Sequence, residues 1–212
     1  DWYLKGEGRE PALHVEIQSN QGSWRTEDRY PASDTEEIIF ELGSDLSRIS
    51  GGSNVLPDAS TGPVYETEPL TEDLYIQGLP RFHVEVTTST VGGQLYALLE
   101  DCDGDNCIHI GHAIMDLRYH EGGEELSSAW TPIFETITAH MEFIALDAEI
   151  MAGHTIRLSL LSTGEDYLPA STSSIVTIQE GAGSTLQLDT FDPGADDRRY
   201  WTPPVCTHDI CE

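Results

Sequence analysis

The stretch DCDGDNC at residues 101–107 is the part of the sequence whose residue types most directly suggest chemistry. Asp101, Asp103 and Asp105 alternate along it, and carboxylate oxygens at such spacing are hard ligands that can wrap a calcium ion. The spacing is not that of an EF-hand, because the glycine comes too early and the twelfth position from Asp101 is His112 instead of a bidentate glutamate. Turn-forming residues between two strands explain the same stretch. The sequence therefore leaves two interpretations, a calcium site and a plain hairpin turn.

The four cysteines form two pairs with the same spacing. Cys102 and Cys107 flank the turn, and Cys206 and Cys211 repeat the gap of four intervening residues near the end of the chain. The simplest pairing is two local disulfides, and we expect this one. Cross-pairing would close a longer loop of the unfolded chain and stabilise the fold more. A zinc site made of the four thiolates, to which His208 or His109 could be added, is also compatible with the sequence, and so is a set of free thiols.

Histidines near the hairpin are candidates for an active or ion-binding site, but their spacing argues against one. His109 and His112 are three residues apart on one expected strand. Residues at that spacing point to opposite faces of a regular strand, so the two rings can share an ion only if a bulge interrupts it. We interpret them as structural. His154 follows Gly153, which is expected to take a positive φ in a turn, and we expect His154 to bridge to a neighbouring loop rather than to act as a general base.

We expect no catalytic residues in this chain. It has no G-x-S-x-G segment, in which a strand, a turn and a helix present a reactive serine. Carboxylate pairs suited to glycoside hydrolysis cannot be singled out, because in so acidic a chain almost any two acids qualify. Aromatic side chains could form a sugar-binding platform or pack in the interior. The candidates are Trp24, Trp130, Trp201, Tyr30, Tyr65 and Tyr167.

Short segments in which every second residue is apolar run through most of the chain, separated by clusters of Gly, Pro, Asn, Asp and Ser. Such alternation is typical of strands that bury one face, and helical periodicity is nearly absent. We expect about ten strands, at residues 13–18, 38–42, 74–77, 83–86, 95–100, 108–119, 141–149, 155–160, 174–179 and 185–188. This pattern predicts an all-β fold, a jelly-roll β-sandwich of two antiparallel sheets with long loops.

The chain is expected to form a single β-sandwich domain over residues 1–212, since its length allows a full core and no break in composition divides it. The core would span about residues 13–190. Residues 43–62 are rich in Ser, Gly, Asn and Asp and are expected to form a long loop. Residues 191–212 have no strand pattern, and we expect a tail that lies across the surface.

The charge is strongly one-sided. There are 38 acidic and 10 basic residues, a net charge of -28, and Lys5 is the one lysine. Scattered acids with arginine in place of lysine predict adaptation to high salt, which screens the repulsion; a secreted acidic protein and a calcium-loaded one are the alternatives. Without a basic face we expect no nucleic-acid partner, and without an apolar run of roughly 18 residues no membrane span. Oxidised cysteines would favour an extracellular location, and otherwise we expect a halophile cytoplasm.

Several segments follow one another in the order of a known module. They are GSWR at 22–25, YP at 30–31, VYETEPLTEDLYIQGLP at 64–80, LYALLED at 95–101, IG at 110–111, LRY at 117–119 and AGHTIRLSL at 152–160. In this order they resemble the C-terminal non-catalytic domain of Xaa-Pro dipeptidyl-peptidases, which cocaine esterase and α-amino-acid ester hydrolases share. The resemblance covers most of residues 24–178, and the sequence after Gly181 has no counterpart in that module that we can align.

The resemblance implies a jelly roll of the galactose-binding type and a place in a larger serine hydrolase. In that plan the serine, aspartate and histidine lie in an α/β-hydrolase catalytic domain of the same polypeptide. This chain would dock on that domain and help to wall its substrate pocket, without a cofactor unless calcium binds. The alternatives are a stand-alone carbohydrate-binding or cell-surface module, a self-sufficient hydrolase, and a subunit of an extracellular assembly in which copies form a homo-oligomer.

Overall fold

Sixteen β-strands and one turn of 3-10 helix make up the regular structure of the described residues. The structure is a computed structural model, and it describes residues 15–50, 55–56, 62–121, 132–164, 167–168, 174–194 and 199–201. All pairings between these strands are antiparallel. No helix in this part of the chain is long and apolar enough to cross a membrane. The all-β prediction is therefore confirmed.

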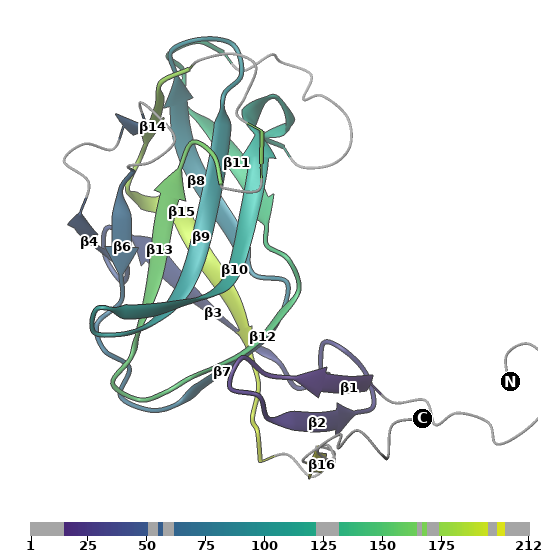
Figure 1. Ribbon diagram of the computed structural model, residues 1–212. Coiled ribbons are helices and arrows are strands. Elements are labelled where there is room, and N and C mark those ends of the chain that lie inside the picture. The colour runs from purple at the N-terminus through teal and green to yellow at the C-terminus, as the bar shows by residue number, and fades with distance from the viewer. Residues whose placement is uncertain are drawn as a thin grey trace, which may run out of the picture.

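Two sheets pack against each other as a sandwich (Figure 1). The five-stranded sheet has the order β10 (Asn106–Asp116), β9 (Gln94–Asp103), β13 (Thr155–Leu161), β6 (Val64–Glu66) and β4 (Ser47–Ser50). The eight-stranded sheet runs through β12 (Leu146–Ile150), β7 (Leu74–Gly78), β15 (Gly181–Thr190), β8 (Arg81–Thr88), β14 (Val176–Ile178) and β5 (Val55–Leu56), with β11 (Ile137–Glu142) beside β8 and β3 (Glu36–Leu42) beside β15. The helical turn η1 (Leu117–Tyr119) follows β10.

A third, small sheet lies at one end of the sandwich, at the lower right of Figure 1. It consists of β1 (Val15–Gln18), β2 (Trp24–Glu27) and β16 (Arg199–Trp201), in the order β1-β2-β16. Two of these strands come from the start of the chain and one from near its end. The small sheet therefore joins segments that are far apart in the sequence.

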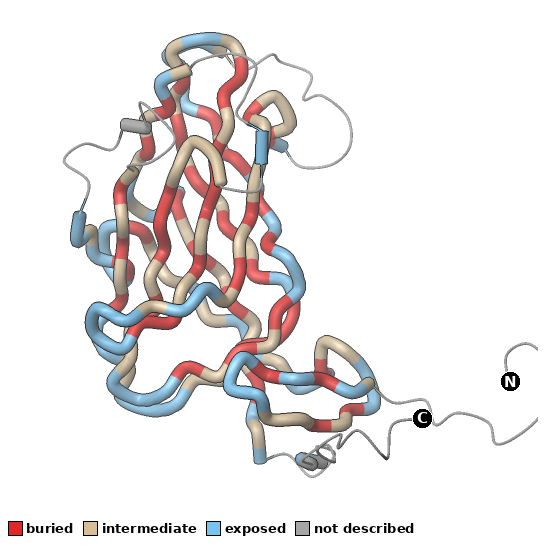
Figure 2. Tube along the Cα trace, in the orientation of Figure 1, coloured by how far each residue is buried: buried red, intermediate tan, exposed pale blue. Residues whose placement is uncertain are grey.

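Alternating burial along the strands builds the core between the two large sheets. In β8, Phe82, Val84 and Val86 are fully buried, while the residues between them are half-buried on the other face. The same alternation in β13 buries Ile156 and Leu158 from the opposite sheet. Figure 2 shows these buried positions along the strands of both sheets. The period-two pattern of the sequence thus defines the inner face of each sheet.

One expected strand is two strands in the structure. Residues 141–149 were expected to be continuous, but β11 ends at Glu142 and β12 begins at Leu146. The alternation breaks between them, because Ile144 and Ala145 are both exposed. The Phe143 amide donates to the Pro80 carbonyl at 2.9 Å, in the connection between β7 and β8. β11 pairs with β8, and β12 pairs with β7. The break between β11 and β12 therefore lies beside the break between β7 and β8.

The expectation of a loop over residues 43–62 is wrong in part. β4 lies within it and pairs with β6, and the two-residue strand β5 pairs with β14. In the turn before β4, Leu46 is fully buried and its carbonyl accepts a hydrogen bond from the Gly43 amide at 2.9 Å. The sequence SRIS of β4 has little strand preference of its own, so pairing with β6 determines its conformation.

The end of the chain also departs from the expectation. Residues 191–212 were expected to have no strand, but β16 pairs with β2 over three residue pairs. Phe191 is buried, with 7% of its surface exposed, so the segment that follows β15 starts inside the fold. Residues 202–212 lie outside the described part of the chain.

Gly78 illustrates how the end of β7 is fitted to the segment before β3. Its φ is +106°, and a Cβ there would lie 3.3 Å from Cγ of Pro31. Its amide also donates a hydrogen bond to the hydroxyl oxygen of Tyr30, at 3.1 Å. A side chain at this position would therefore meet both an unfavourable backbone angle and a close neighbour.

We expect the Gly78→Ala substitution to lower the free energy of unfolding by about 1–3 kcal/mol, the usual cost of holding a non-glycine residue at such a backbone angle. The measurement is urea unfolding at constant salt. Gly194→Ala is the matched control, because Gly194 is exposed and does not have a positive φ. Equal midpoints for the two variants would contradict this account of Gly78.

Candidate functional site

The hairpin that the sequence singles out joins β9 to β10 and has the geometry of a tight turn. Asp103 pairs with Asn106 and Cys102 pairs with Cys107 in the strand register. Gly104 has a φ of +59°, as the turn requires. Cys102 and Cys107 form a disulfide, with an S–S distance of 2.12 Å. Cys206 and Cys211 lie outside the described residues, so their pairing stays a prediction.

The three aspartates of the expected calcium site are not brought together. Asp101 is buried, with 1% exposed, while Asp103 and Asp105 are exposed. The reason is that Asp101 points inward and its Oδ1 lies 2.7 Å from Nδ1 of His154. In the described ranges no three His, Cys, Asp or Glu side chains are arranged to hold a metal ion. The carboxylates therefore take different environments instead of sharing one.

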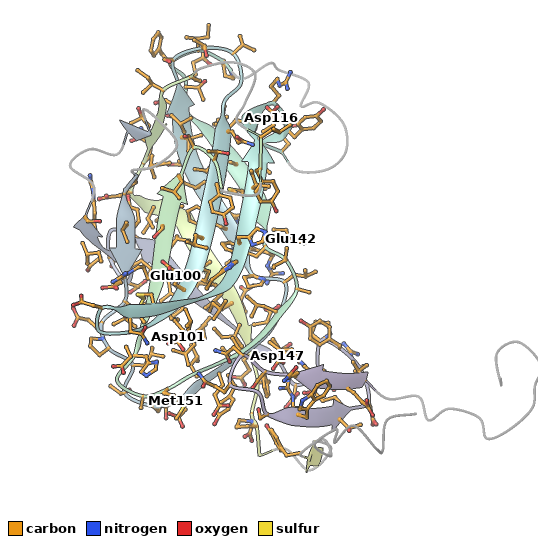
Figure 3. The ribbon with its side chains drawn as sticks, in the orientation of Figure 1. Glu100, Asp101, Asp116, Glu142, Asp147 and Met151 are labelled. Atoms are coloured by element: carbon orange, nitrogen blue, oxygen red, sulfur yellow. A yellow bond between two sulfur atoms is a disulfide. The ribbon has the colours of Figure 1, made fainter. Side chains whose placement is uncertain are left out.

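His154 forms a polar bridge just before β13, but its partner lies on a strand and not in the neighbouring loop that we expected. It follows Gly153, whose φ is +90° as expected for the turn. Its partner Asp101 belongs to β9, so the contact joins two neighbouring strands of the five-stranded sheet, at the site labelled Asp101 in Figure 3. This contact positions the turn before β13. The family resemblance includes this GH segment, and the structure gives it a packing role.

The expectation for His109 and His112 is corrected by a β-bulge. The register of β10 against β9 shifts between His109, opposite Glu100, and Gly111, opposite Leu99. Ile110 is the extra residue, so His109 and His112 point to the same, outer face of the sheet. Their ring nitrogens, Nε2 of His109 and Nδ1 of His112, are 3.2 Å apart.

Two of the aromatic residues considered for a sugar platform are structural. Tyr65 is fully buried, and its hydroxyl donates to Glu180 at 3.1 Å. The Tyr30 hydroxyl donates to the Leu146 carbonyl at 2.7 Å. Tyr167 is 36% exposed and its hydroxyl oxygen lies 2.8 Å from His112 Nε2. Trp130 and the side chain of Trp201 are outside the described part of the structure.

A buried charge cluster that the sequence analysis did not find joins the small sheet to the sandwich. Arg25 and Glu27 on β2 are each only 2% exposed. The guanidinium of Arg25 donates to both carboxylate oxygens of Asp147, at 2.7 Å from Nη1 to Oδ1, and from Nε to Glu27 at 2.5 Å. Figure 3 labels Asp147 where the sandwich meets β1 and β2. This is the largest group of buried charged side chains that the described residues show.

The cluster continues into the larger sheet through neutral hydrogen bonds. Gln77, on β7 opposite Asp147, donates to Glu27 Oε2 at 3.2 Å and accepts from the Ala32 amide at 2.7 Å. Gln77 is fully buried although it points to the outer face of β7, because the segment from β2 to Ala32 covers it. These hydrogen bonds therefore extend the contact between the small sheet and the sandwich.

In the cluster one guanidinium lies between two carboxylates, those of Glu27 and Asp147. Burial alone would lower the pKa of Arg25, but the hydrogen bonds to Asp147 and Glu27 outweigh it and raise the pKa above its ordinary value. The guanidinium carbon lies 4.4 Å from the centre of the Phe191 ring, which adds a cation-π contact on its face. Arg25 therefore stays charged throughout the neutral pH range.

The junction also covers one edge strand of the sandwich, β12. The Asn20 side chain accepts from the Glu149 amide at 2.7 Å and donates to its carbonyl at 3.2 Å. Since β12 is an edge strand, these bonds satisfy backbone groups that would otherwise be open to pairing. The small pocket beside Arg25, lined also by Ser19, Ser23 and Tyr75, has room for roughly one water molecule. The junction is therefore a structural contact and not a substrate cleft.

The fold and this junction define a class, a β-sandwich domain in which the first and last described strands form a small sheet against one end. Comparison with models of protein families gives the family within that class. Residues 6–198 match the X-Pro dipeptidyl-peptidase C-terminal non-catalytic domain, so the chain belongs to that family. The family suggested by the sequence segments is thereby confirmed. No curated protein sequence matches the chain significantly.

Solved structures with a similar fold share little sequence. A CocE/NonD family hydrolase from Staphylococcus aureus has a TM-score of 0.70 and 13% identity, over 91% of this chain and 44% of that one. An aminopeptidase from a marine sediment Thaumarchaeota archaeon has a TM-score of 0.67 and 14% identity, over 91% and 42%. An α-amino acid ester hydrolase has a TM-score of 0.52 and 15% identity, over 84% and 36%. The chain thus spans less than half the length of these structures.

We expect Arg25→Met to lower the free energy of unfolding by about 3–5 kcal/mol, because it leaves the buried carboxylates of Glu27 and Asp147 without a counterion. Arg81→Met is the matched control. Arg81 pairs with Glu37 at 2.6 Å and with Asp189 at 3.3 Å, but the three side chains are 39%, 43% and 24% exposed. Pairs exposed to this extent should each contribute no more than about 1 kcal/mol. Denaturant unfolding of both variants at one salt concentration measures the difference, and similar losses would contradict the assignment.

Proposed function

We propose that this chain is the C-terminal accessory domain of a CocE/NonD-type serine hydrolase, a peptidase or esterase, in which it supports the catalytic domain. The observation that carries the proposal is the family match over residues 6–198, to a domain described as non-catalytic. Relatives of known structure are more than twice as long as the matched part, since the chain covers 42% and 44% of two of them. The catalytic serine, histidine and aspartate would lie in that remaining part of the polypeptide.

The domain would act by docking on an α/β-hydrolase domain and helping to wall its substrate pocket. In a C-terminal domain the catalytic domain precedes it in the polypeptide, and the small sheet contains the first described strands. The Arg25 cluster fixes that sheet on the sandwich through buried, bidentate contacts, which hold orientation better than a flexible linker. A rigid junction of this kind supports a role in positioning one body against another.

The alternative of a stand-alone carbohydrate-binding or cell-surface module has less support in the described residues. Tyr30 and Tyr65, two of its platform candidates, are held by hydrogen bonds inside the fold. Binding of the isolated chain to a glycan array would favour that alternative. Such glycan binding would count against the accessory role if the gene sequence upstream of Asp1 also encoded no hydrolase domain.

The sequence of the gene upstream of Asp1 tests the accessory role. We expect it to encode an α/β-hydrolase domain with a G-x-S-x-G segment. The purified 212-residue chain should then fail to hydrolyse an Ala-Pro nitroanilide or a phenyl ester above the buffer rate. Turnover by the isolated chain that survives repeated purification would overturn the proposal.

Adaptation to high salt is the second part of the proposal. The net charge of -28 repels itself in dilute buffer, and counterions screen that repulsion. We expect the unfolding midpoint to rise by roughly 10 °C between dilute buffer and molar potassium chloride, equivalent to about 3 kcal/mol for a domain of this size. Calorimetry over a series of potassium chloride concentrations measures it. A curve that stays flat would exclude the adaptation.

A further inference from the structure

The bulge in β10 creates an arrangement that a regular strand could not, two imidazole rings with nitrogens facing each other on one side of a sheet. Nε2 of His109 and Nδ1 of His112 are 3.2 Å apart. His109 is exposed and His112 half-buried, so both are accessible from the outer face of the five-stranded sheet. The arrangement depends on Ile110, the extra residue that shifts the register.

The bulge is fixed by packing on the opposite side of the strand. Gly111 is buried against the other sheet, where an added Cβ would lie 2.9 Å from Cδ2 of Leu146. Ala113, two residues on, is also buried in the core. Because Gly111 and Ala113 must face inward, His112 between them must face outward. The position of the second ring is therefore set by the core.

Two aromatic neighbours hold the second ring in place. Tyr96 stacks on His112, with ring centres 5.7 Å apart and planes inclined by 24°. The hydroxyl oxygen of Tyr167 lies 2.8 Å from His112 Nε2, on the far side of the ring from His109. When Nε2 carries the proton and donates it to Tyr167, Nδ1 of His112 directs its lone pair at His109 Nε2, with which it shares a hydrogen bond in the metal-free protein. This is the arrangement of a metal-binding histidine whose other nitrogen is held by a hydrogen bond.

The spacing of the two nitrogens fits one shared ion. Two nitrogens bound to the same zinc ion at about 2.05 Å with a tetrahedral angle lie about 3.3 Å apart. We propose that His109 and His112 form a binding site for a divalent transition-metal ion of the zinc, copper or nickel type, bound through Nε2 of His109 and Nδ1 of His112. Imidazole nitrogens prefer such ions to calcium or magnesium.

The surroundings favour a cation. Glu100, labelled in Figure 3, is the register partner of His109 on β9 and lies on the same face. The protein as a whole carries a net charge of -28. No third His, Cys, Asp or Glu side chain of the described residues joins the pair in a group suited to a metal, so water would complete the coordination. The proposal goes beyond the accessory role and does not depend on it.

Titration of the full chain with Zn²⁺, followed by calorimetry, tests the site. The protein is used without reductant and with any free thiols alkylated, in potassium chloride with excess Mg²⁺ to occupy carboxylates. We expect one Zn²⁺ per chain, and a loss of affinity of at least about tenfold in His109→Ala and in His112→Ala. The control is His140→Ala, in the pair of His83 and His140, whose rings meet edge to face at 4.6 Å. Its affinity should match that of the unmodified protein.

The role of Tyr167 as a positioning residue has a separate readout. Tyr167→Phe should weaken Zn²⁺ binding by about tenfold, while the unfolding midpoint of the metal-free protein stays the same. Unchanged affinity would overturn that role.

The electron paramagnetic resonance spectrum of the Cu²⁺-loaded unmodified protein gives a test that needs no variant. We expect couplings to two equivalent imidazole nitrogens. Coupling to fewer nitrogens, Zn²⁺ affinity that persists in both His109→Ala and His112→Ala, or an equal loss in His140→Ala would each overturn the site.

Discussion

The buried guanidinium of Arg25 is the interaction on which the attachment of the small sheet to the sandwich depends. Without the small sheet, Gln77 and Asp147 would stand on the outer face of the large sheet as ordinary surface residues. With the small sheet in place, Gln77 and Asp147 are buried near the guanidinium of Arg25. A buried charge is costly unless it is paired and hydrogen-bonded. A charge buried in this way fits few geometries, so it fixes the orientation of β2 more narrowly than apolar packing would. The remaining contacts, from Asn20 and Tyr30, act on a junction already set by Arg25.

The regular part of the fold follows from the sequence because one physical rule governs it. Wherever apolar residues alternate, as in residues 155–160 and 83–86, the expected strand lies in the structure with the expected face inward. The rule fails where a strand has no alternating pattern. WRTE in β2 and SRIS in β4 form strands because partner strands offer free backbone groups: β2 lies between its neighbour β1 and the distant β16, and β4 pairs with β6. Pairing of this kind is not encoded locally.

The candidate site shows the same division. The hairpin at 101–107 could be predicted from the sequence, because turn residues and cysteine spacing act over a few positions. The environment of Asp101 could not be predicted in this way, because its partner His154 lies more than fifty positions later, in the turn before β13. The same holds for Arg25 and Glu27, whose spacing of two places them on one face but does not reveal that Asp147 lies opposite. The bulge at Ile110 depends on the close approach of Gly111 to Leu146, and no local sequence pattern predicts that approach.

The pairing of early with late strands affects how this domain is made. β3 has β15 as its ladder partner in the described structure, and Glu36 bonds to Thr190, 154 positions later in the sequence. β2 likewise meets β16 near residue 200. During synthesis β2 and β3 leave the ribosome long before β16 and β15 exist, so the closing step of folding comes after almost the whole domain has been translated. Until then, the apolar side chains on the inner face of β3 have no partner strand to cover them. The many negative charges of the nascent chain help to keep it soluble during this time.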